Sequence, residues 1–64
     1  MVNLVSQRAV DSLFHAFFAL TDIRAILRST APAHELNESE QERVRVLLEE
    51  MGRQLGVLKE ELLR

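Results

Sequence analysis

Two runs of apolar residues at helical spacing, separated by a corner that holds the only proline, constrain the fold more than any other feature of the chain. In each run the apolar positions recur in alternating steps of four and three, a period typical of an amphipathic helix. The first stripe is Ala9, Leu13, Ala16, Leu20, Ile23 and Leu27, and the second is Val44, Leu48, Met51, Leu55, Leu58 and Leu62. We therefore expect two helices that pack against each other along these two stripes.

The corner has the sequence STAPAHELN. Pro32 cannot continue the interior of a helix, and it disfavours the helical backbone conformation for Ala31. After the corner, Asn37 is followed three residues later by Glu40. This spacing predicts a capping box, in which each residue satisfies the backbone N–H of the other.

These signals predict an all-α fold, an antiparallel two-helix hairpin that forms a single domain over the whole chain. The first helix is expected at about residues 3–29, the corner at 30–37 and the second helix at about 38–63. Asn3 and Ser6 both have side chains suited to the N-cap of the first helix.

The first helix is apolar over a much wider arc than the second, about 220° against about 100°. A chain of 64 residues without cysteine has a marginal core of its own, so we expect the excess apolar surface to be buried by dimerisation into a four-helix bundle. The predicted association surface consists of Leu13, Phe14, Phe17, Phe18 and Leu20, with Phe14 and Phe18 near the two-fold axis. An alternative that stays open is that Phe14 and Phe18 dock another protein.

Charged residues on the outer sides of the helices predict local pairs. Glu49 and Arg53 have the spacing of an i,i+4 ion pair. Asp11 lies four residues before His15, where a carboxylate would favour the imidazolium form. Asp11 and His15 alone are too few ligands to predict a metal site.

Composition argues against several classes of function. The chain lacks a glycine-rich phosphate loop, a cysteine nucleophile and a serine placed with a histidine base, so no catalytic residue, cofactor or enzymatic activity is expected. The net charge is −2 and no basic stripe emerges, which argues against nucleic acid. No apolar run is long enough to span a bilayer and no signal peptide is evident, so a cytoplasmic location is expected.

The segment LFHAFFALTDIRAIL, followed by a second heptad helix, resembles in outline the dimerisation and phosphotransfer hairpin of histidine kinases. This resemblance implies that His15 would accept a phosphoryl group. Ala16 stands where that family has an acidic residue. In length and expected architecture the chain also resembles Rop, a plasmid copy-number regulator, which implies an RNA-binding helical dimer.

Taken from the residues themselves, the sequence favours a non-catalytic protein–protein interaction or regulatory module that acts as a homodimeric helical bundle. Phosphotransfer through His15 and RNA binding by a helical dimer remain the alternatives.

Overall fold

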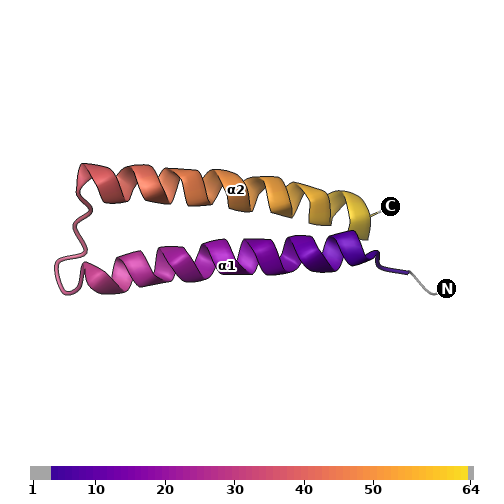
Figure 1. Ribbon diagram of the computed structural model, residues 1–64, viewed down its shortest axis with the longest axis horizontal. Coiled ribbons are helices and arrows are strands. Elements are labelled where there is room, and N and C mark those ends of the chain that lie inside the picture. Colours follow the sequence, from indigo (N-terminus) through magenta and orange to yellow (C-terminus); the bar gives the residue numbers. More distant parts are fainter. Residues whose placement is uncertain (1–3, 64) are drawn as a thin grey trace.

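The computed structural model describes residues 4–63, which form two helices packed against each other as an antiparallel hairpin (Figure 1). Helix α1 spans Gln7–Ser29 and helix α2 spans Glu38–Leu62. The corner lies at one end, and the start of α1 and the end of α2 lie together at the other. The hairpin is elongated, with dimensions of 50 × 17 × 14 Å. The predicted all-α hairpin is thus confirmed.

Ser6 is the N-cap of α1. It has extended backbone angles, and its Oγ accepts a hydrogen bond from the backbone N–H of Ala9 at 3.2 Å. The backbone before it, from Leu4 on, is not helical, so α1 begins later than predicted. The alternative cap, Asn3, lies outside the described residues.

Asn37 and Glu40 form the predicted capping box at the start of α2. The Glu40 N–H donates to Asn37 Oδ1 at 2.8 Å, and the Asn37 N–H donates to Glu40 Oε1 at 3.0 Å. Glu38 adds a second carboxylate to the first turn, where negative charge favours the helix dipole. Local chemistry therefore fixes where α2 begins.

Hydrogen bonds close the corner that follows α1. The hydroxyls of Ser29 and Thr30 donate to the carbonyls of Ile26 and Leu27, both at 2.7 Å. The His34 N–H donates to the Thr30 carbonyl at 2.8 Å. Several carbonyls at the end of α1 are satisfied in this way, as a helix end requires.

Small side chains form the line along which α1 contacts α2. The buried residues of α1 are Ala9, Ser12, Ala16 and Ala19, and half-buried Ile23, Ile26 and Thr30 continue the same line. The contact line of α2 consists of its half-buried residues: Glu40, Val44, Leu47, Glu50, Met51, Gln54, Val57, Leu58 and Glu61. Among the described residues no large side chain is fully buried.

The predicted helix–helix contact is wrong at three positions of each helix. Leu13, Leu20 and Leu27 on α1 and Leu48, Leu55 and Leu62 on α2 are all between 41% and 54% exposed. The reason is that alanine and serine let two helices approach closely, so the contact line follows the small residues. The leucines are left beside it.

Candidate association surface

Two ion pairs between the helices mark one broad face of the hairpin, which we call the polar face. Arg8 Nη1 lies 3.2 Å from Glu61 Oε1, and Arg43 Nη2 lies 3.8 Å from Asp22 Oδ2. The Glu61 side chain is only 6% exposed, so its carboxylate is held near the interface with α1. Both pairs bridge the two helices on the polar face.

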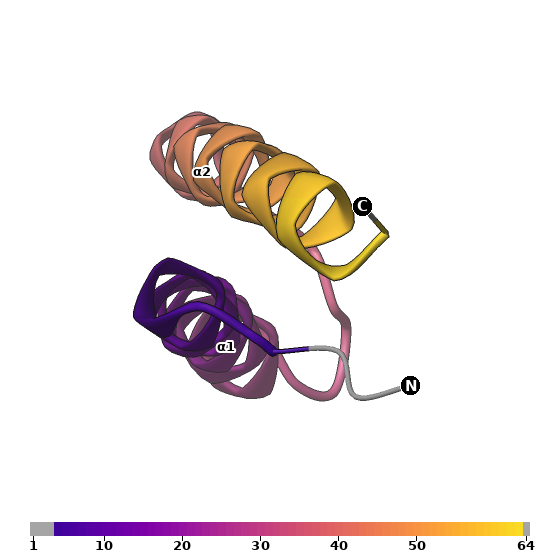
Figure 2. The same cartoon turned by 90° about the vertical axis from the view of Figure 1, so that its right-hand side faces the viewer.

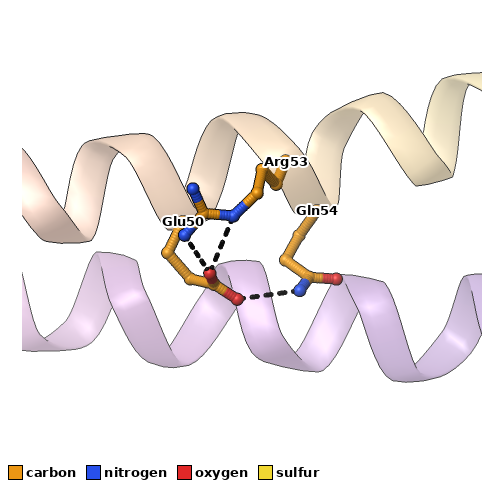
Figure 3. A network of polar contacts seen from close by, with 3 residues as sticks. All are labelled: Glu50, Arg53 and Gln54. Atoms are coloured by element: carbon orange, nitrogen blue, oxygen red, sulfur yellow. Dashed lines mark hydrogen bonds and ion pairs between the residues drawn. The ribbon is translucent and has the colours of Figure 1, made fainter.

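Glu50 organises a further network at the edge of α2 beside α1 (Figure 3). Arg53 donates to Glu50 Oε2 from Nη2 at 2.6 Å and from Nε at 3.2 Å, and Gln54 Nε2 donates to Oε1 at 2.8 Å. These hydrogen bonds from Gln54 and Arg53 hold the pKa of Glu50 below its ordinary value. The prediction that Arg53 pairs with Glu49 is wrong. Arg53 reaches Glu50 equally well, and Glu50 also accepts a hydrogen bond from Gln54.

His15 is exposed and lies on the polar face. It is near enough to Glu50 on the other helix to be the smallest of the influences that lower the pKa of that carboxyl. Asp11, the carboxylate predicted beside it, accepts a hydrogen bond from Gln7 Nε2 at 3.0 Å. Within residues 4–63 no group of three or more histidine, cysteine or acidic side chains could hold a metal ion.

The six exposed leucines lie together on the opposite side of the hairpin, and we call this surface the leucine face: Leu13, Leu20, Leu27, Leu48, Leu55 and Leu62. At about 100° per residue, each is turned by about 50° to 110° from the contact line of its helix, and in the same sense on both helices. Because the helices are antiparallel, the same sense of rotation leads to the same broad face. The residues of the ion pairs are turned in the opposite sense, to the polar face.

The leucines of the two helices also lie at similar positions along the long axis of the hairpin. Interpolation between the Arg8–Glu61 and Asp22–Arg43 pairs places Leu13 level with Leu55, and Leu20 within one helical turn of Leu48. Figure 2, which views the hairpin along its length, shows two helices side by side with no third element over either face. Within the described chain, nothing covers the leucine face.

The three phenylalanines occupy the outer side of α1. Phe14, Phe17 and Phe18 are all more than half exposed, and at about 100° per residue each points at least 130° away from the contact line with α2. The rings of Phe17 and Phe18 contact each other edge to face, with centroids 6.4 Å apart. The five residues predicted for association are therefore all exposed but fall into two groups, with Leu13 and Leu20 on the leucine face.

Sequence reasoning missed the contribution of α2 to this surface. Leu48, Leu55 and Leu62 were expected to be covered by α1. The signal that could have found them is the seven-residue spacing they share with Leu13, Leu20 and Leu27, since equal leucine rows on two helices indicate a surface shared by both.

At the corner end, the leucine face continues into an open apolar pocket of about 410 Å³. Its lining comes from α1 and the corner: Leu20, Ile23, Arg24, Leu27, Arg28, Ala31 and His34.

Comparisons of the chain with protein-family models, with curated proteins and with solved structures give no match. Neither α1 nor α2, as far as the structure describes them, is long and apolar enough to cross a membrane.

Proposed function

We propose that this protein is a non-catalytic interaction or regulatory module whose folded unit is a homodimeric four-helix bundle. Two hairpins stack through their leucine faces, and the polar faces remain outward. The observation that carries this proposal is the direction in which both apolar stripes point.

The stripes do not point from one helix of the hairpin to the other. On average the α1 stripe is turned by about 50° and the α2 stripe by about 70° from the contact line, and both turn toward the leucine face. In a four-helix bundle of square cross-section, every helix has two neighbours at right angles, and the bundle centre lies about 45° from the line to either neighbour. The two stripes therefore have the direction expected for helices of a bundle, while a lone hairpin would have them facing each other.

The solvent-accessible area of the chain is also larger than expected for a monomer of its mass. A monomer of 7.3 kDa is expected to expose about 4,200 Å², whereas this chain exposes 5230 Å². The excess, roughly 1,000 Å², is close to the roughly 800 Å² that each partner buries in a standard protein interface. One further copy of the hairpin is enough to account for it.

The free energy of burying apolar side chains also favours dimerisation. The buried residues of α1 are three alanines and a serine, which remove little apolar area from water. Completing the burial of one half-exposed leucine stabilises a structure by roughly 1 kcal/mol. Six such leucines in each chain are a large term beside the total stability of a small domain, about 5–15 kcal/mol.

A matched pair of substitutions tests the proposal. Leu48 and Val46 are both 53% exposed in the hairpin, but Leu48 lies on the leucine face and Val46 does not. We expect Leu48→Glu to abolish the dimer in sedimentation equilibrium, and Val46→Glu to leave it intact. Equal effects of the two substitutions would show that the leucine face is not the interface.

In this arrangement Phe14 and Phe18 stay on the outside of the bundle, where they are available to another protein. Replacing both by serine is expected to preserve the dimer and to weaken capture of such a partner. If the Phe14→Ser/Phe18→Ser variant were monomeric, the dimer interface would instead lie at the phenylalanines, as the sequence alone suggested.

Phosphotransfer is the second candidate, and the observation that favours it is the position of His15. In the proposed bundle His15 stays accessible, because it lies on the polar face. The chain would then carry an acid-labile phosphate when a phosphorylated response regulator is supplied, and His15→Gln would abolish it. Unchanged labelling of His15→Gln would remove this candidate.

RNA binding receives less support from the charges. Arg8, Arg43, Arg45 and Arg53 each pair with a carboxylate, so they are partly neutralised for contacts with phosphates. A salt-sensitive mobility shift with RNA at low ionic strength would reinstate this alternative.

A further inference from the structure

The corner pocket combines an apolar floor with basic side chains. Leu20, Ile23, Leu27 and Ala31 supply the apolar part, and the other lining residues are Arg24, Arg28 and His34. No acidic residue lines the pocket. Its volume of about 410 Å³ is within the range of small-molecule sites, roughly 300–1,000 Å³.

The two arginines of the pocket differ from the rest. Residues 4–63 contain six arginines, and four of them form ion pairs with carboxylates. Within this part of the chain, Arg24 and Arg28 alone have no carboxylate partner. Unpaired guanidinium groups beside an apolar surface are suited to an anion that carries a hydrocarbon chain.

Hydrogen bonds to the last carbonyls of α1 reduce the repulsion between this end of the helix and a nearby anion. The carbonyls at a helix C-terminus repel negative charge, but those of Ile26 and Leu27 accept hydrogen bonds from the hydroxyls of Ser29 and Thr30. The hydrogen bond from the His34 N–H to the Thr30 carbonyl holds the corner backbone at the part of the pocket that His34 lines. The unfavourable end of the helix dipole is thus partly compensated.

We propose that the corner pocket binds an anionic amphiphile of the medium-chain carboxylate class. The hydrocarbon chain lies against Leu20, Ile23 and Leu27, and Arg24 and Arg28 bind the carboxylate. Every lining residue belongs to one chain, but Leu20 and Leu27 also lie on the leucine face. The hydrocarbon chain and the second hairpin of the proposed dimer therefore compete for these two side chains.

Isothermal titration calorimetry with decanoate as the probe tests the site, with decan-1-ol and acetate as the tail-only and head-only comparisons. We expect one decanoate per chain, binding at least about tenfold more tightly than decan-1-ol because the alcohol lacks the charge-assisted hydrogen bonds. Acetate should not bind measurably. Equal affinity for decanoate and decan-1-ol, or more than one decanoate per chain, would overturn the proposal.

Two double variants with the same change in net charge identify the arginines involved. Arg24→Gln/Arg28→Gln should weaken decanoate binding by about tenfold or more and leave decan-1-ol unaffected. The control, Arg45→Gln/Arg53→Gln, removes two arginines that already have carboxylate partners and should leave decanoate affinity unchanged. Equal losses in the two variants would mean that only net charge matters, and the site would be refuted.

A variant that fills the pocket tests its apolar part. Ala31 is exposed in the corner, so Ala31→Leu adds bulk to the lining without removing a buried contact. Binding of decanoate should be lost while helix content, measured by circular dichroism, is retained; undiminished binding would contradict the assignment. Sedimentation of the Arg24→Gln/Arg28→Gln variant reports the dimer separately, because neither arginine belongs to the leucine face. Loss of decanoate binding with the dimer retained concerns the pocket alone, so failure of the pocket and failure of the bundle are distinguishable.

Discussion

At the scale of single residues, side-chain size decides how close the helices lie. Ala16 and Ala19 are buried where α1 meets α2, so a larger side chain at either position is expected to move the helices apart. Beside this line, Glu50 shows how one carboxylate is fixed by two donors from its own helix, Arg53 and Gln54.

Enlarging a buried alanine should therefore destabilise the hairpin. We expect Ala19→Leu to lower the free energy of unfolding by about 1–3 kcal/mol, because the added bulk forces the helices apart. Urea denaturation followed by circular dichroism measures the loss. Ala25→Leu is the matched control, since Ala25 is exposed on α1, and its effect should stay within about 0.5 kcal/mol. Equal losses would contradict the close helix contact.

Because the pKa of Glu50 is lowered in the folded state, the stability of the fold should depend on pH. A carboxyl group whose pKa is lower in the folded state stabilises the fold at pH values above its ordinary pKa of 4.5, and this stabilisation is lost as the pH falls through the folded value. Glu50→Gln should therefore lower the melting temperature at neutral pH and have a smaller effect below pH 4.5. A difference between the two proteins that does not change with pH would show that the network does not hold the charged form.

At the scale of elements, the sequence predicted what local chemistry controls. The capping box of Asn37 and Glu40 was predicted and is present, because its two hydrogen bonds join residues only three apart. The choice between Glu49 and Glu50 as partner of Arg53 could not be read in the same way. Both spacings allow an ion pair, and the Gln54 donor, which spacing does not weigh, accompanies Glu50.

The capping box gives a prediction for α2. Asn37→Ala removes the oxygen that accepts the Glu40 N–H and should destabilise the fold by about 1 kcal/mol. Ser39→Ala is the control, because Ser39 lies in the same turn, is exposed and makes no capping contact. Thermal unfolding of both variants measures the difference, and equal melting temperatures would show that the cap contributes nothing.

At the scale of the whole molecule, the periodicity of apolar residues fixed two stripes but not what covers them. A stripe can face one neighbouring helix or the space between two neighbours, and the spacing of Leu13, Leu20 and Leu27 is the same in both cases. Only the contact line of small residues, which depends on how closely α1 and α2 approach, reveals that the leucines are turned aside. For the same reason the association surface was predicted on α1 alone, without the leucines of α2.

The most direct test of the central claim is the mass and helix content of the unmodified chain in solution. Sedimentation equilibrium over a range of micromolar concentrations should give twice the chain mass of 7.3 kDa, with helix content falling on dilution as the dimer dissociates. A chain that sediments at 7.3 kDa and keeps its full helix content would contradict the proposed bundle.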